Sequence, residues 1–138
     1  MTDNEISQDL LIHGIRPSLQ RIQIYRYLDE HRTHPTANEI YTRIHEHIHV
    51  LSRMTIYNTL KLFEKKGVIS PIIIEDAELR YDINTRFHGH FRCQRCGAVY
   101  DIFDLLECKI PSDLEGFQVR QQHLYYIGIC KQCVENTN

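Results

Sequence analysis

Two cysteine pairs constrain the fold of this chain more than any other feature of its sequence. Each pair is a C-x-x-C motif, in which one tight turn presents two sulfur atoms. Two such turns can close a tetrahedron around zinc, and thiolate ligands favour zinc over magnesium or calcium. Four sulfur ligands fill every tetrahedral position, so none remains for water or substrate. The pattern predicts a structural zinc site with the ligands Cys93, Cys96, Cys130 and Cys133.

A His88-Gly89-His90 triplet lies just before the first cysteine pair. These histidines cannot join a zinc ion that four thiolates already surround, so they raise the question of a second metal ion. A catalytic zinc would need an open coordination position and a nearby base. The cysteine set closes that position, and no glutamate follows either histidine in an HxE or HExxH pattern. We therefore expect a protein that is not an enzyme.

The sequence favours a cytoplasmic protein without a membrane partner. Its N-terminus is acidic and polar, unlike a secretory signal, and no apolar run approaches membrane-spanning length. Five cysteines are an odd number, and four of them have metal-ligand spacing, so a reducing compartment is favoured over a disulfide framework. We expect the fifth, Cys108, to be a small thiol in a buried or half-buried position, with a reactive role as the alternative.

Charge is distributed unevenly along the chain. Residues 14–66 carry nine lysines and arginines against five acidic residues, a balance of 9 − 5 = +4. The whole chain has a net charge of −2, so the remaining residues sum to −6. Such an asymmetry fits a nucleic-acid-facing half joined to an acidic, metal-binding half.

The first half of the chain has the sequence pattern of four helices. Thr36 and Glu39 form a capping box, in which each side chain accepts a hydrogen bond from the other residue's backbone N–H. Gly67 is suited to end the last helix in the left-handed conformation. The first expected helix is Ser7–His13, which Gly14 ends, and the second is capped by Ser18, with Leu19, Ile22, Tyr25 and Leu28 facing inward. The third is opened by Thr36 and buries Ala37, Ile40, Tyr41 and Ile44. The fourth starts at Ser52, with Ile56, Leu60 and Phe63 facing inward.

Two short strands are expected after these helices. Residues 68–74 and 79–83 have strand-forming composition, and residues 75–78 provide the turn of a hairpin. Helices followed by a hairpin describe a winged helix-turn-helix, whose fourth helix would enter the major groove of DNA. Polar side chains on that helix suit base edges and phosphates, although an ordinary amphipathic helix also has a hydrated face. The expected DNA contacts on it are Arg53, Thr55, Tyr57, Asn58 and Lys61.

The second half, from about Phe87, alternates short strands and turns. Strands are expected over residues 88–93 and 98–102, with a longer one over residues 117–129 and a helix around residues 104–107. The segment between the cysteine pairs is longer than in a simple zinc ribbon, so zinc would pin a small α/β domain at both ends. The fold class expected for the whole chain is α+β.

Several motifs resemble those of the ferric uptake regulator family of metal-dependent repressors. They are HPTANEIY (residues 34–41), TIYNTL (55–60), RYD (80–82), HxHxxCxxCG (88–97) and IGICxxC (127–133). They follow the family's order and spacing from about Ile15 to Cys133. The resemblance implies a winged-helix DNA-binding domain over residues 1–84, a hinge at about 84–87 and a small α/β dimerisation and metal-binding domain over 88–138. It also implies a homodimer that binds double-stranded operator DNA when it holds metal.

The resemblance further implies a regulatory ion. The positions that match the family's ligands carry three imidazoles and two carboxylates, and this sulfur-free set suits Fe(II) or Mn(II) better than a structural zinc. Because ligands come from both halves of the chain, the ion would set the angle between the domains and shift the population towards one arrangement. The ligands are His34, Asp82, His88, His90 and Asp101. Arg16 matches a family position whose basic side chain reaches the minor groove, with a phosphate or solvent contact as the alternative.

Two residues favour the peroxide-sensing branch of the family over the iron-sensing branch. Asp101 occupies a position where peroxide sensors have Asp and iron sensors commonly have Glu, and Asn58 lies where iron sensors often carry Arg. Many iron sensors have a further metal site, whose ligand positions are occupied here by Phe87, Gly89 and Gln122 in place of the family's ligands. The neighbouring His123 is one residue out of register, so in a strand it would face the other way.

In the peroxide-sensing branch, Fe(II) reacts with hydrogen peroxide, the iron-bound histidines are oxidised, and metal and DNA are released. By position, His34 and His88 are the expected oxidation targets. Mn(II) would support DNA binding without this reaction. The resemblance thus predicts a repressor that senses hydrogen peroxide. The alternative is an iron-responsive repressor without peroxide sensing, because the two kinds of sensor share most of their ligands.

Overall fold

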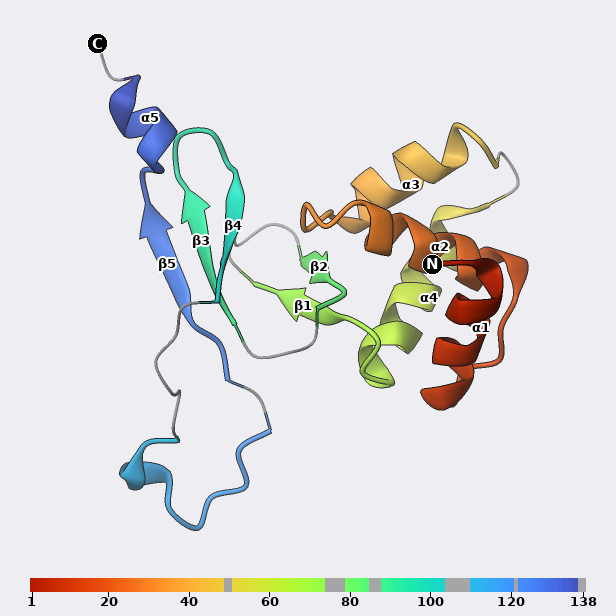
Figure 1. The fold of residues 1–138 in the computed structure, drawn as a ribbon, viewed down its shortest axis with the longest axis horizontal. Helices are drawn as coiled ribbons and strands as arrows, with labels where there is room; N and C mark the ends of the chain where they lie inside the picture. Colours follow the sequence, from red (N-terminus) through yellow and green to blue (C-terminus); the bar gives the residue numbers. More distant parts are fainter. Residues whose placement is uncertain (49–50, 74–78, 85–87, 104–109, 121, 137–138) are drawn as a thin grey trace. The chain divides into compact units, whose positions relative to one another are not determined.

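The computed structural model describes the chain apart from residues 49–50, 74–78, 85–87, 104–109, 121 and 137–138 (Figure 1). The chain divides into two compact units, residues 1–85 (the N-terminal unit) and residues 86–138 (the C-terminal unit). The N-terminal unit contains α1 (Asp3–Ile12), α2 (Leu19–Glu30), α3 (Ala37–His45), α4 (Arg53–Lys65), β1 (Ser70–Ile72) and β2 (Arg80–Asp82). The C-terminal unit contains β3 (Gly89–Cys93), β4 (Val99–Ile102), the short 3₁₀ helix η1 (Ser112–Leu114), β5 (Tyr125–Gly128) and α5 (Lys131–Glu135).

The second, third and fourth helices begin where their capping residues predict. The side chains of Ser18, Thr36 and Ser52 each accept a hydrogen bond from the backbone N–H three residues on, at 3.1 to 3.2 Å. Glu39 completes the capping box of α3 by accepting from the Thr36 N–H at 3.2 Å. Gly67, with φ of 78°, follows α4 in the left-handed conformation, as expected.

The first helix begins earlier than predicted. α1 starts at Asp3 rather than Ser7 because Thr2 and Glu5 form a second capping box. The Thr2 N–H donates to the Glu5 carboxylate at 2.6 Å, and the Glu5 N–H donates to the Thr2 hydroxyl at 3.2 Å. This T-x-x-E signal was present in the sequence, and it brings Ile6 into the helix as a fully buried side chain.

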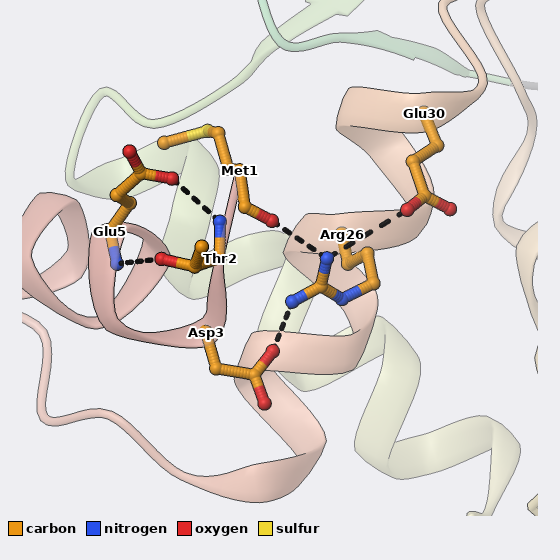
Figure 2. Close-up of polar contacts among 6 residues, drawn as sticks. All are labelled: Met1, Thr2, Asp3, Glu5, Arg26 and Glu30. Atoms are coloured by element: carbon orange, nitrogen blue, oxygen red, sulfur yellow. Dashed lines mark hydrogen bonds and ion pairs between the residues drawn. The ribbon is translucent and has the colours of Figure 1, made fainter.

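Arg26 of α2 ties the start of α1 to the second helix (Figure 2). Its guanidinium donates to the Met1 carbonyl at 2.8 Å, bonds the Asp3 carboxylate and faces Glu30 at 3.8 Å. Within the described part of the chain, none of the helices is long and apolar enough to cross a membrane.

One hydrophobic core fills the N-terminal unit, and the predicted inward faces mostly contribute to it. The three core residues expected on α4 are fully buried, and the side chains expected to face inward on α3 are buried apart from Tyr41, which is half-buried. Leu19 was wrongly assigned to the core: it is the first residue of α2, and its side chain is 68% exposed. Ile24, which the prediction missed, is buried instead, beside Tyr25 and Leu28.

The predicted hairpin is present as β1 and β2, which pair antiparallel with Ser70 opposite Asp82. Each strand is shorter than predicted. Pro71 lies in the middle of β1 and has no N–H to donate, which limits the ladder. A bridge between Thr36 and Arg80 adds the segment before α3 to the edge of β2. The turn expected at residues 75–78 lies outside the described residues.

The C-terminal unit is built on a three-stranded sheet in the order β4-β3-β5. β3 pairs antiparallel with β4, His90 opposite Asp101, and parallel with β5, Cys93 opposite Gly128. The long strand predicted over residues 117–129 is reduced to β5, because a parallel neighbour requires a crossover connection that uses the residues before it. α5 and η1 were not predicted, and the helix expected at residues 104–107 lies outside the described residues.

Candidate metal centres and DNA-binding surface

The four cysteines lie together at one end of the C-terminal sheet. Cys93 ends β3, and Cys130 follows β5, so the parallel pairing of these strands brings the two cysteine pairs to the same end. The four Sγ atoms lie within 4.8 Å of one another, and those of Cys96 and Cys130 are 3.9 Å apart. A tetrahedral zinc with Zn–S bonds of about 2.3 Å requires sulfur atoms about 3.8 Å apart. The cluster, which Cys133 completes, therefore fits a structural zinc site.

Backbone donors prepare the first cysteine as a thiolate. The Cys93 sulfur accepts from the N–H of Cys96 at 3.4 Å and from the N–H of Cys130 at 3.3 Å, and these bonds lower the pKa of Cys93 to about 5. Gly97, with φ of 75°, closes the turn by donating to the Cys93 carbonyl at 2.9 Å. Hydrogen bonding with the Cys130 thiol raises the pKa of Cys133 to about 12. A bound dication would hold all four as thiolates.

His34 and Asp82 form a nitrogen-and-oxygen ligand pair inside the N-terminal unit. His34 lies between α2 and α3, Asp82 ends β2, and both side chains are buried. The His34 Nε2 atom is 3.6 Å from Asp82 Oδ2. The other carboxylate oxygen, Oδ1, accepts from the Asn84 N–H at 2.9 Å, which fixes the orientation of the carboxylate.

His88, His90 and Asp101 form a second nitrogen-and-oxygen set, inside the C-terminal unit. Asp101 lies opposite His90 in the β3–β4 ladder, and its Oδ1 atom is 3.3 Å from His88 Nε2 and 3.4 Å from His90 Nε2. Both histidines are buried, and Phe103 stacks on His88 with ring centroids 5.1 Å apart. Two imidazole nitrogens and one carboxylate oxygen thus converge on one point, as ligands of a single ion do.

Among the described residues, His45 and His123 belong to no comparable group. His123 is exposed and lies 3.2 Å from the Tyr125 hydroxyl, and the neighbouring Gln122 is exposed as well. Phe87 and Cys108 lie outside the described residues, as does His49. His45 stacks on Tyr41 with ring centroids 5.0 Å apart. Among the described residues, no further group of three or more His, Cys, Asp or Glu side chains could hold an ion.

The residues predicted to contact DNA do not share one face of α4. Arg16, Thr55 and Asn58 line a hollow of 520 Å³ at the N-terminal end of α2. Arg21 also lines it and donates to the Arg16 carbonyl at 2.7 Å. Sequence reasoning did not single out Arg21, although its place three residues after the Ser18 cap puts it in the first turn of α2.

Tyr57 and Lys61 lie on the other side of α4, where they line a second hollow, of 360 Å³, with residues from α3 and β2. Arg53 is directed to α3: it donates to the Asn38 side chain at 2.8 Å, and its guanidinium carbon lies 4.4 Å from the centre of the Tyr41 ring. Which of these side chains contact DNA stays a prediction, as does the assignment of metal ligands.

Comparisons with known proteins agree with this architecture. The ferric uptake regulator family model matches residues 13–127. The peroxide-responsive repressor PerR of Staphylococcus epidermidis is 34% identical over 129 residues, covering 91% of this chain and 85% of that protein. The Helicobacter pylori ferric uptake regulator Fur, described as having three functional metal binding sites, aligns with a TM-score of 0.72 at 21% identity, covering 100% of this chain and 97% of its own. PerR from Streptococcus pyogenes aligns with a TM-score of 0.53 at 27% identity, covering 95% and 92%.

Fold and ligand sets together define a metal-dependent transcriptional regulator with a helical, hairpin-bearing unit and a metal-binding unit. The chain belongs to the ferric uptake regulator family.

Proposed function

We propose that this protein is a repressor that binds operator DNA as a homodimer and releases it when hydrogen peroxide is present. The observation that carries the proposal is the separation of two kinds of donor. One cluster offers only sulfur, which suits a structural zinc, and the remaining ligands offer only nitrogen and oxygen, which suit Fe(II) or Mn(II). Thiolates need a reducing compartment, which supports a cytoplasmic location.

The regulatory ion would be held by His34 and Asp82 from the N-terminal unit together with His88, His90 and Asp101 from the C-terminal unit. In each unit an imidazole nitrogen already lies within 3.6 Å of a carboxylate oxygen. An ion that binds both sets would favour one arrangement of the units, because a ligand shifts the population towards the state that it binds better. We propose that this arrangement is the one competent for DNA.

A homodimer is supported by the surface of the C-terminal unit. β5 is an edge strand of the described sheet, and two of its apolar side chains, Tyr126 and Ile127, are 50% and 53% exposed. An exposed edge strand with apolar side chains is a surface that natural proteins cover. A second copy of the chain is the occupant that the proposal assigns to it.

Peroxide sensing is supported by Asp101, by Asn58 and by the similarity to PerR proteins. Bound Fe(II) would supply the reaction with hydrogen peroxide, in which one oxygen atom enters an imidazole ring and the other leaves as water. The chain's own contribution is to hold imidazoles beside a carboxylate, as Asp101 does for His88. The proposed targets are His34 and His88. An oxidised ring is a poorer ligand, so loss of the ion would release the DNA.

An iron-responsive repressor without peroxide sensing is the second candidate, since it would use the same ligands. To separate the two, operator duplexes are first selected from a random library with the Mn(II)-loaded protein. Binding by the Fe(II) and Mn(II) forms is then measured before and after peroxide, with mass spectrometry of the peptides that contain His34 and His88. We expect loss of binding and the gain of one oxygen atom in the iron form alone.

Asp101→Glu is the matched variant for this experiment, because it keeps a carboxylate ligand and introduces the residue common in iron sensors. We expect it to bind the selected duplex and to be oxidised more slowly. If the iron-loaded wild-type protein keeps DNA bound after peroxide, with His34 and His88 at unmodified mass, peroxide sensing is contradicted and the second candidate is supported. Failure to select any duplex with the Mn(II)-loaded protein would contradict the repressor itself.

A further inference from the structure

His34 has an unusual backbone conformation. It is the only non-glycine residue in the described part of the chain with a positive φ, 57°. This conformation costs a residue with a β-carbon roughly 1–2 kcal/mol, and the backbone of a residue that precedes proline, as His34 precedes Pro35, is restricted further. His34 is also only 4% exposed. Its surroundings must therefore stabilise the strained conformation.

Strand β2 supplies two contacts that hold this segment. Arg80 Nη1 donates to the His34 carbonyl at 3.3 Å, and the Tyr81 N–H donates to the Pro35 carbonyl at 3.0 Å. The bridge between Thr36 and Arg80 continues this pairing towards α3. Because Pro35 has no N–H, it cannot return a hydrogen bond to β2. The Arg80 side chain therefore provides an attachment that backbone pairing alone cannot.

The same strand also faces the imidazole ring of His34. Asp82 ends β2, and its Oδ2 atom lies 3.6 Å from His34 Nε2. Arg80 thus lies on the backbone side of His34, while Asp82 lies on the ring side. If the His34 carbonyl were released, φ could return to a negative value, and the direction of the ring relative to Asp82 would change.

We propose that Arg80 is a positioning residue for the His34 ligand. By donating to the His34 carbonyl, it holds the backbone of His34 in the left-handed conformation that directs the imidazole at Asp82. This inference rests on the proposed function, because it assumes that His34 and Asp82 bind the regulatory ion. It makes the hairpin part of the metal site, since β2 supplies both the attachment and a ligand. Groups that support a ligand in this way typically change metal affinity roughly 10- to 100-fold when they are removed.

Charge and positioning predict opposite results for the loss of Arg80. A guanidinium near a cation site repels the cation, so removing the positive charge by itself should tighten metal binding. Removing the donor that fixes a ligand should weaken it. The sign of the change in Mn(II) affinity therefore separates the two effects.

The test measures the Mn(II) dissociation constant of the full-length, zinc-loaded protein by electron paramagnetic resonance. We expect Arg80→Met, which keeps the aliphatic stem without donors, to bind Mn(II) roughly 10- to 100-fold more weakly. Arg80→Lys keeps the charge and a donor and should retain most of the affinity. Arg43→Met removes the same charge from an exposed position on α3 and should change nothing.

Hydrogen exchange at the Tyr81 amide provides an independent readout, and it should be faster in Arg80→Met than in wild type. If Arg80→Met fails to fold, Arg80→Gln takes its place, because its side chain ends two bonds before Nη1 and so removes both the charge and the contact with the His34 carbonyl. Weaker Mn(II) binding by the variant that folds supports positioning, and unchanged or tighter binding overturns the role of Arg80. Wild-type protein that binds no Mn(II) refutes the proposed function instead.

Discussion

The two units of this molecule are stabilised by different means. The N-terminal unit has a continuous hydrophobic core, in which Ile56, Leu60 and Phe63 of α4 are fully buried. In the C-terminal unit, the described residues that are buried are the proposed ligands His88, His90, Cys93 and Cys130, together with Gly89. Apolar side chains of that unit, such as Phe103, remain exposed. The helical unit is thus stabilised by burial, whereas for the sheet unit we propose stabilisation by metal coordination and by contacts with a partner.

Zinc removal is the strongest test of this contrast. Cys130→Ser removes one of the four thiolates, and structural zinc sites contribute on the order of 10 kcal/mol or more to folding. We expect the amides of β3, β4 and β5 to lose protection from hydrogen exchange while those of α2 to α4 keep it. Protection retained in both units after loss of zinc would show that the C-terminal unit does not depend on the metal.

A cavity in the helical core should have the reverse effect. Phe63→Ala removes a fully buried ring and should lower the free energy of unfolding of the N-terminal unit by about 3–5 kcal/mol. The zinc content of the chain should stay unchanged. Met54→Ala on the same helix is the control, because its side chain is 67% exposed. Loss of zinc in the Phe63 variant would show that the two units fold as one.

In the helical unit, removing a helix cap should lower the free energy of unfolding more when the cap is buried than when it is exposed. Thr36→Ala removes a buried capping hydroxyl and should cost up to about 2 kcal/mol in chemical denaturation, whereas Thr2→Ala, at an exposed cap, should cost about 0.5 kcal/mol. Equal costs would mean that burial of the cap has no influence.

The smallest effect is expected on the proposed DNA-binding surface. Arg53 is bound to α3, so Arg53→Met should lower the free energy of unfolding by about 0.5–1 kcal/mol and leave the salt dependence of operator binding unchanged. Lys61→Met should leave stability unchanged and reduce the slope of log affinity against log salt by about 1 if Lys61 contacts a phosphate. A reduced slope in the Arg53 variant would identify Arg53 as a phosphate contact after all.

Local signals accounted for most of what the sequence could predict. Caps such as Ser18, Thr36 and Ser52 act over a few residues, and each marks the start of its helix in the structure. The start of α1 was available in the same way, from Thr2, but was overlooked. Non-local features were not available. β5 is limited to the four residues that pair with β3, a strand that lies far away in the sequence. Nothing near Tyr125 in the sequence records that pairing.

The candidate sites divide in the same way. Spacing alone grouped Cys93 with Cys96, because a tight turn is a local structure. His88 and His90 were visible as a local pair, but the full proposed set of nitrogen and oxygen ligands came only through the family resemblance. Nothing in the local sequence relates His34 to Asp82, or His90 to Asp101. Side-chain direction was beyond the sequence as well: the helical pattern marks Arg53 as exposed but does not reveal its contact with Tyr41.

The parallel pairing of β3 with β5 also bears on the order in which the molecule is made. The core of the N-terminal unit ends at Tyr81, so this unit can fold while the rest of the chain is still being synthesised. Four thiolates cannot surround zinc until Cys133 has left the ribosome, because the second cysteine pair follows β5 and is synthesised last. A nascent chain therefore has a finished α4 before it has a zinc cluster, a complete sheet or a strand edge to offer a second copy.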